Sequence, residues 1–237
     1  MPETTAPLPD ETSPSTATPP LRSTRKRHGA RNQEKSKEFV KWLRSTFHNF
    51  DHVVDVAGGK GELAARLTLC HGASVTLIDP RVGVDIEQVY IQRVVPRLPE
   101  KWQKRLAQRQ ADNPAFLSNL IAQRFRHLSV YFTENTLDGD IRSVLEDCTL
   151  LIGLHADAAT ECIVDAALRN NIPFVVVPCC VFPNLFHTRT IFHEESGRTE
   201  VVRNHEQFCR YLLQKDPRLQ VAQLPFEGRN TAIWWEG

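Results

Sequence analysis

Apolar residues follow two different spacings from residue 36 onward. Short continuous apolar runs predict buried strands, whereas apolar positions three and four residues apart predict helices. The predicted strands cover residues 52–57, 73–79, 127–133, 149–155, 173–178, 219–224 and 230–235. The predicted helices cover residues 36–47, 60–70, 139–147, 156–170 and 204–215, with a further charged, helix-rich insertion at about 83–125.

The alternation of strands and helices predicts an α/β, Rossmann-like fold, in which helices cover both faces of a mainly parallel seven-stranded sheet. Only a few residues join the last two strands. A crossover to a parallel strand needs a dozen or more, so these two strands form a C-terminal antiparallel hairpin. Asn204 and Gln207 are spaced to form a capping box at the start of the last helix. The order of the strands does not follow from the sequence.

Residues 1–35 differ in composition from the domain predicted for residues 36–237. The first twenty residues hold six prolines among Thr, Ser and acidic residues, which predicts a disordered tail. A basic end follows, either a solvated linker or localisation signal, or an arm that contacts the phosphates of RNA. Its cations include Arg22, Arg25, Lys26, Arg27 and Arg31.

The overall composition argues against a strongly charged protein and against a membrane-spanning one. With 41% hydrophobic residues, 24% charged residues and a net charge of +1, the chain matches an ordinary globular domain with no strong overall field. No apolar run is long enough to cross a membrane, so no membrane partner is expected. The six cysteines lack the spacing of a zinc finger and suit reduced thiols. We therefore expect an intracellular, reducing compartment, cytoplasmic or nuclear in the first instance and mitochondrial as the alternative.

A glycine-rich loop follows the first predicted strand, in the segment Asp55-Val-Ala-Gly-Gly-Lys-Gly61. It does not fit the P-loop pattern, but it fits the dinucleotide pattern G-x-G-x-x-A from Gly59 onward. Two carboxylates, Asp55 and Glu62, bracket this loop, and they repel a pyrophosphate and attract a cation. The loop is therefore better suited to S-adenosylmethionine (SAM), which carries a sulfonium and an ammonium group and no phosphate.

The same segment resembles motif I of the class I SAM-dependent methyltransferases, D-x-G-x-G-x-G, with Ala57 in place of the first glycine. The resemblance implies that Asp55 orients the methionyl end of SAM and that Asp79, after the second strand, holds the ribose hydroxyls. It also implies that the loop after the third strand contacts the adenine, although a helix cap explains those polar residues equally well. The expected cofactor-binding residues are Asp55, Ala57, Gly58, Gly59, Gly61, Asp79 and Glu134.

Candidate catalytic residues follow the fourth and fifth strands. His155 and Asp157 are the candidate base and its orienting partner, although Asp157 also suits a helix cap. Cys179 and Cys180 are candidate nucleophiles for methylation of pyrimidine C5, or small residues that pack the floor of the site. Adjacent cysteines have unsuitable geometry for zinc, so no metal is expected.

A more specific resemblance, to one group within the class I methyltransferases, is carried by three features together: His155, the Ala-Thr-Glu segment that ends at Glu161, and the paired cysteines. Over roughly residues 36–237 the chain is similar to the tRNA acceptor-stem 2′-O-ribose methyltransferases and related eukaryotic methyltransferase-like proteins. The zinc-binding modules and a second pair of histidines are missing. The resemblance implies a SAM-dependent methyltransferase that acts on RNA (tRNA or rRNA). Two alternatives stay open: a protein or small-molecule methyltransferase, and an inactive RNA- or ribosome-associated assembly factor. The basic insertion either contacts RNA or is a solvated face.

Overall fold

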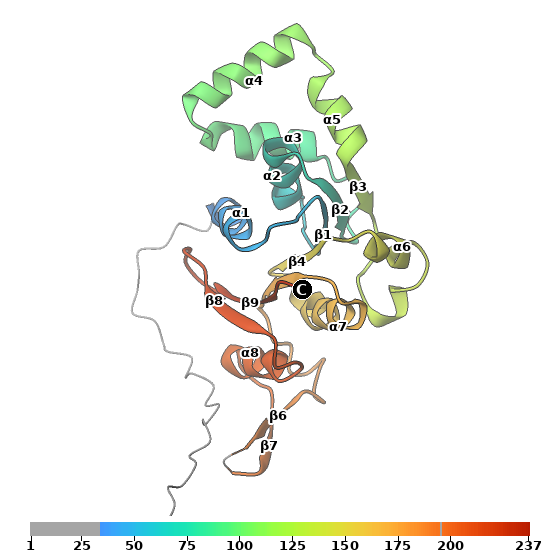
Figure 1. The fold of residues 1–237 in the computed structure, drawn as a ribbon, viewed down its shortest axis with the longest axis vertical. Coiled ribbons are helices and arrows are strands. Elements are labelled where there is room, and N and C mark those ends of the chain that lie inside the picture. Colours follow the sequence, from blue (N-terminus) through green and yellow to red (C-terminus); the bar gives the residue numbers. More distant parts are fainter. Residues whose placement is uncertain (1–33, 195) are drawn as a thin grey trace, which may run out of the picture.

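The computed structural model describes residues 34–194 and 196–237 (Figure 1). The predicted disordered tail and its basic residues 22–31 lie outside the described residues, apart from Glu34 and Lys35 at the end of the tail. Within the described ranges no helix is long and apolar enough to cross a membrane.

Seven strands form one sheet in the order β3-β2-β1-β4-β5-β9-β8. The first five strands are mutually parallel, while β9 runs antiparallel to both β5 and β8. The predicted Rossmann-like sheet with its C-terminal hairpin is therefore confirmed. The strands are β1 (His52–Val56), β2 (Ser74–Ile78), β3 (Phe125–Leu128), β4 (Leu150–Leu154), β5 (Phe174–Val177), β8 (Gln220–Gln223) and β9 (Thr231–Trp235).

Helices cover both faces of this sheet, and β1 shows why. Val53 packs with Phe39 of α1 and Leu67 of α2, whereas the next residue, Val54, packs with Ile163 of α7 on the opposite face. This alternation follows from the two-residue period of a strand. The flanking helices are α1 (Lys35–Thr46), α2 (Glu62–His71), α6 (Asp140–Glu146), α7 (Thr160–Asn170) and α8 (His205–Leu213).

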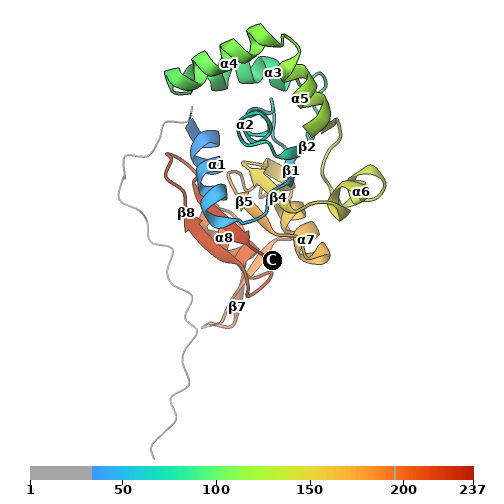
Figure 2. The ribbon, with the colours of Figure 1, turned by 45° about the horizontal axis from the view of Figure 1, so that its top comes forward.

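A series of helices connects β2 to β3. It forms an arch of helices beyond α2, at the top of Figures 1 and 2. Ile86, Tyr90 and Leu117 form a small core with Ala65 of α2, which fixes the base of the arch. The insertion contains α3 (Ile86–Val89), the π-helical turn η2 (Tyr90–Val94), the 3₁₀ turn η3 (Val95–Arg97), α4 (Glu100–Asp112) and α5 (Phe116–Arg124).

The third strand differs from its prediction. We expected a strand over residues 127–133, but β3 covers Phe125–Leu128. Phe125 pairs with Val75 and Leu128 pairs with Ile78, the last residue of β2, so the pairing stops there. The apolar run beyond it forms a loop in which Tyr131 is exposed and Phe132 is buried. The alternating pattern of that loop resembles a strand although it has no neighbouring strand to pair with.

A second difference lies in the region after β5, for which no strand was predicted. β6 (Thr190–His193) and β7 (Arg198–Val201) form a separate antiparallel hairpin there. Most of its side chains are exposed, so the run lacks the apolar signal of a buried strand. The helix that follows, α8, begins with the predicted capping box of Asn204 and Gln207.

Candidate cofactor and active site

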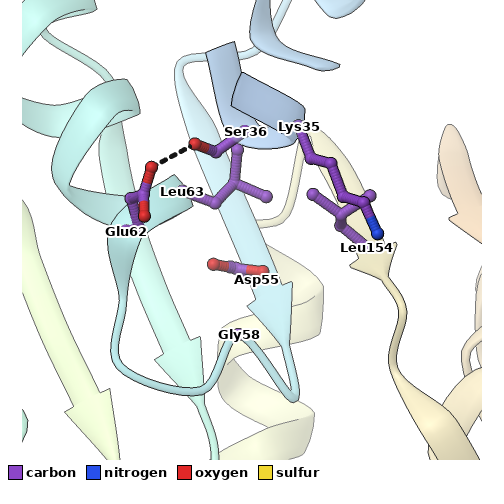
Figure 3. A pocket seen from close by; sticks show the side chains of 7 residues that line it. All are labelled: Lys35, Ser36, Asp55, Gly58, Glu62, Leu63 and Leu154. Atoms are coloured by element: carbon purple, nitrogen blue, oxygen red, sulfur yellow. Dashed lines mark hydrogen bonds between the residues drawn. The ribbon is translucent and has the colours of Figure 1, made fainter. Parts of the chain in front are cut away.

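Asp55 lies on the face of β1 that points toward α1 and α2, two residues after Val53. It lines a cavity of about 160 Å³ together with Lys35, Ser36, Glu62 and Leu154 (Figure 3). The cavity lies at the carboxyl ends of the parallel strands, where open α/β sheets bind their ligands.

The Asp55 carboxylate is completely buried, and neither of its oxygens has a hydrogen-bond partner within the described chain. Burial, reinforced by the negative charge of Asp79, raises the pKa of Asp55 to about 8. A buried carboxylate without a partner is costly, and a bound ammonium or other donor would offset that cost. The side chain therefore has the character of a ligand-binding group.

The glycine loop leaves no room for side chains beside this carboxylate. A Cβ on Gly58 would lie 2.4 Å from Asp55 Oδ2, and a Cβ on Gly61 would lie 2.8 Å from the side chain of Ile86. Gly61 also has a φ of 78°, the left-handed conformation at the N-terminus of α2. The spacing of these glycines thus lets the backbone pass close to both the acid and the insertion.

Ala57, which replaces the first glycine of the resembled pattern, adopts a φ of 54°. Residues other than glycine adopt this conformation at a cost. The loop therefore begins with a strained residue, in a conformation that glycine adopts more readily.

Asp79 follows β2 and is almost fully buried. Its Oδ2 accepts a hydrogen bond of 2.8 Å from the backbone amide of Gly59, and its Oδ1 accepts one of 3.0 Å from the amide of Arg81. The exposed guanidinium of Arg81 lies 3.4 Å from Oδ2. The structure thus brings Asp79 and the glycine loop into direct contact, so that one nucleoside could touch both.

The last predicted cofactor residue, Glu134, starts the turn η4 (Glu134–Thr136). Its carboxylate accepts a hydrogen bond of 2.6 Å from Arg169 at the end of α7. Thr133 and Thr136 form a capping box at the same turn, so a helix-cap role is satisfied there. Contact with adenine stays a prediction for this residue.

His155 immediately follows β4, with a φ of 59°. Its Nε2 lies 2.8 Å from the carbonyl oxygen of Arg229, in the turn between β8 and β9. A carbonyl can only accept, so Nε2 carries the proton and Nδ1 keeps its lone pair. Burial lowers the pKa of His155, which keeps the ring neutral at pH 7. The side chain has the protonation state of a general base.

Asp157 does not orient His155 by a hydrogen bond in the described structure. Instead, its Oδ1 accepts a hydrogen bond of 3.0 Å from the thiol of Cys179. Burial, together with this contact, raises the pKa of Cys179 to about 12. A nucleophilic cysteine needs a lowered pKa, so this environment favours a protonated thiol that donates a hydrogen bond.

Asp157, Cys179 and Cys180 each offer a metal-binding atom, and these atoms lie within 4.8 Å of one another. This grouping makes them the residues that could hold a soft divalent ion. In the described structure two of these three side chains, Cys179 and Asp157, are already hydrogen-bonded to each other.

Backbone strain is concentrated at the same edge of the sheet. Ala57 after β1, His155 and Asp157 after β4, and Phe182 after β5 all have positive φ values, between 49° and 59°. Such residues each cost about 1–3 kcal/mol and cluster at active sites, because the surrounding structure holds them in position.

Several residues at the site were not among the sequence-based candidates. Lys35 lines the cavity at the start of α1, and its Nζ lies 5.9 Å from the centre of the Phe226 ring. The guanidinium of Arg81 contacts Asp79, and the carbonyl oxygen of Arg229 contacts His155. Lys35 belonged to the basic stretch in the sequence, but only the packing of α1 against α2 brings it beside Asp55.

No protein-family model and no curated protein matches this chain. Among solved structures, the methyltransferase domain of a bacterial Hen1 protein (CtHen1) is similar, with a TM-score of 0.47 and 15% identity, over 86% of this chain and 98% of that one. Magnesium protoporphyrin IX methyltransferase of Synechocystis PCC 6803, with bound SAM, has a TM-score of 0.43 and 12% identity, over 86% and 79%. The glycopeptide N-methyltransferase MtfA, complexed with SAM, has a TM-score of 0.44 and 14% identity, over 92% and 100%.

The class of the fold follows from the chain's own strand order. Five parallel strands in the order β3-β2-β1-β4-β5, completed by the antiparallel pair β9-β8, form the class I methyltransferase fold. The glycine loop and its two acids lie at the carboxyl ends of β1 and β2, the edge at which open α/β sheets bind their ligands.

Proposed function

We propose that this protein is a SAM-dependent methyltransferase and that its acceptor is RNA. The observation that carries the first part is Asp55, a buried carboxylate that lines a cavity beside a glycine loop and has no hydrogen-bond partner among residues 34–194 and 196–237. This side chain fits the ammonium group of SAM, and Asp79, joined to the loop through Gly59, fits its ribose hydroxyls. When bound, SAM supplies an electrophilic methyl group on its sulfonium.

The chain's own contribution to the reaction is positioning and proton removal. The carboxyl edge of the sheet presents His155 Nδ1 as a neutral acceptor, held by the bond from Nε2 to Arg229. An acceptor hydroxyl or amine would lose its proton to this nitrogen as the methyl group is transferred. Correct alignment of acceptor and cofactor would supply much of the rate acceleration.

RNA is the favoured acceptor because of the resemblance carried by His155, Glu161 and the paired cysteines. A second support is α1, on which the exposed cations Lys41 and Arg44 follow the cavity residue Ser36. The Cys179 thiol, protonated and bonded to Asp157, does not support pyrimidine C5 chemistry. A ribose hydroxyl, or a base atom that needs no cysteine adduct, is therefore the better target.

The test is transfer of tritiated methyl groups from SAM to fractionated cellular RNA and protein. We expect label in RNA, and we expect His155→Ala to lower the turnover number by about 10²–10⁴ while SAM binding, measured by calorimetry, stays within a few-fold. Label in protein alone would replace RNA as the acceptor. A full-length protein that binds no SAM would instead support the inactive assembly factor.

A further inference from the structure

A groove of about 990 Å³ lies between α1, α2 and the helical insertion. α1 contributes Lys37, Lys41 and Arg44 to its walls, and α4 contributes Arg105 and Arg109. None of the residues that line it, all within the described part of the chain, is an aspartate or a glutamate. We refer to this hollow, defined by these five cations, as the basic groove.

The positive charge of the basic groove is largely uncompensated. Two deeper arginines, Arg66 and Arg97, each lie 3.5 Å from the same Glu62 oxygen, so one negative charge is shared between them. Lys37 pairs with Glu34 at 3.3 Å. The other four cations, Lys41, Arg44, Arg105 and Arg109, are exposed, and no ion pair joins any of them to a carboxylate of the described residues. Exposed cations that gather in a concave surface focus a positive field, which suits a polyanionic ligand.

The basic groove also presents an aromatic surface. Trp102 of α4 lines it with 51% of its surface exposed, and the Arg105 guanidinium lies 5.5 Å from the centre of its ring. The guanidinium of Arg109 lies at the same distance from the ring of Phe116. Rings combined with cations along a groove are typical of surfaces that bind single-stranded nucleic acid, because bases stack on the rings while phosphates meet the cations.

The basic groove adjoins the cofactor cavity. Ser36 of α1 lines the cavity and the next residue, Lys37, lines the groove; on α2, Glu62 lines the cavity and Arg66, one turn later, lines the groove. In Figure 2 the insertion helices extend over α1 and α2. One end of the basic groove therefore lies beside the cofactor cavity, at the starts of α1 and α2.

We propose that the basic groove binds a single-stranded segment of RNA, with phosphates on the cations of α1 and α4 and a base stacked on Trp102. The choice of RNA as the nucleic acid rests on the proposed function. An acidic peptide would match the cations but would leave the exposed indole ring without a planar partner.

The test uses the full-length protein and a fluorescein-labelled 12-nucleotide single-stranded RNA of mixed sequence, with anisotropy read over a range of salt concentrations and no SAM present. Two double variants, Arg105→Ala/Arg109→Ala and Lys41→Ala/Arg44→Ala, remove groove cations. The matched control, Lys101→Ala/Lys104→Ala, removes the same charge from residues of α4 that do not line the groove.

We expect each groove variant to weaken RNA binding at least tenfold and to reduce the salt slope by about 1.4, since each phosphate contact contributes about 0.7. The control variant should change binding less than twofold. Trp102→Ala should weaken binding at least fivefold, at the lower end of what one stacked base contributes, and Trp102→Phe should restore most of it. Equal effects of the groove and control variants would overturn the proposal.

Two further outcomes keep this inference separate from the proposed function. If a polyglutamate peptide displaces the RNA as well as unlabelled RNA does, and Trp102→Ala has no effect, the groove binds acidic peptides and the RNA proposal is overturned. Calorimetry with SAM should give the same affinity for the groove variants as for the parent protein. A protein that binds SAM but no RNA contradicts the groove inference alone, and one that binds RNA but no SAM contradicts the proposed function.

Discussion

The backbone amide of Gly59 donates a hydrogen bond of 2.8 Å to Oδ2 of Asp79, twenty residues further along the chain. This single contact ties the loop after β1 to the acid after β2. Parallel pairing of β1 with β2 brings Val56 beside Ile78, so that the residues after each strand meet at one edge. The contact makes Asp79 both a support for the loop and a candidate ligand for ribose.

Substitution of Asp79 by alanine should weaken SAM binding by more than tenfold, because the ribose hydroxyls would lose their acceptor and Gly59 would lose its partner. Calorimetry gives the affinity, and Asp51→Ala, at an exposed position before β1, is the control. Arg81→Ala removes the guanidinium near Oδ2 but leaves the carboxylate in place. Unchanged affinity in Asp79→Ala would show that this carboxylate does not hold the ribose.

Asp55 should make the stability of the ligand-free protein depend on pH. Its pKa is about 8 in the folded chain and about 3.9 in an unfolded one. Between these values the folded state holds a proton that the unfolded state releases, so the free energy of unfolding falls as pH rises from about 4 to about 8. Asp55→Asn removes the ionisation, and the variant should be more stable than the parent protein at pH 9.

Urea unfolding at pH 6 and pH 9 measures this difference, with Asp51→Asn as an exposed control that keeps the parent's dependence on pH. SAM should raise the melting temperature of the parent protein and leave that of Asp55→Asn almost unchanged, since a ligand stabilises only a state that binds it. Identical pH dependence in Asp55→Asn and the parent would contradict the assignment of a buried, uncompensated carboxylate.

Ala57→Gly should stabilise the fold. The φ of 54° costs alanine about 1–2 kcal/mol, and the extra chain entropy of glycine offsets only about 0.5–1 kcal/mol of this. We expect a gain of up to about 1 kcal/mol, which raises the melting temperature of a domain of this size by roughly 2–4 °C. Ala107→Gly, at an exposed position within α4, should lower it instead. A lower melting temperature for Ala57→Gly would contradict the strain at this position.

Asp157→Asn should make Cys179 more reactive. Burial makes the largest contribution to the raised pKa of this thiol, and the hydrogen bond with Asp157 makes the next largest. Without the negative charge the pKa should fall, the thiolate fraction should rise, and alkylation by iodoacetamide at pH 8 should become faster. Mass spectrometry follows Cys179, with Cys70, an exposed free cysteine in α2, as an internal reference. Equal rates before and after the substitution would remove the carboxylate from the account of this thiol.

The helical insertion and the two glycine-loop acids were predictable because each depends on neighbours in the sequence. The charged, helix-rich segment at about 83–125 predicted the insertion without separating its helices, and the spacing from Asp55 to Gly61 identified the loop. β3 was placed too late because the run from 129 to 133 has the right side chains for a strand, and only the length of β2 decides where pairing ends. The hairpin of β6 and β7 was missed because an exposed strand has no continuous apolar signal.

The sequence by itself therefore determined the class of fold, the cofactor loop and the candidate residues at the strand ends, since strand and helix periods and short spacings are local properties. Tertiary structure alone decided which of these side chains meet. It paired His155 with the carbonyl of Arg229 and Asp157 with Cys179. It also buried Asp55 away from any hydrogen-bond partner in the described part of the chain, and it joined α1 and α4 into the basic groove. These contacts connect residues distant in the chain, and they depend on strand order and helix packing, which no local pattern encodes.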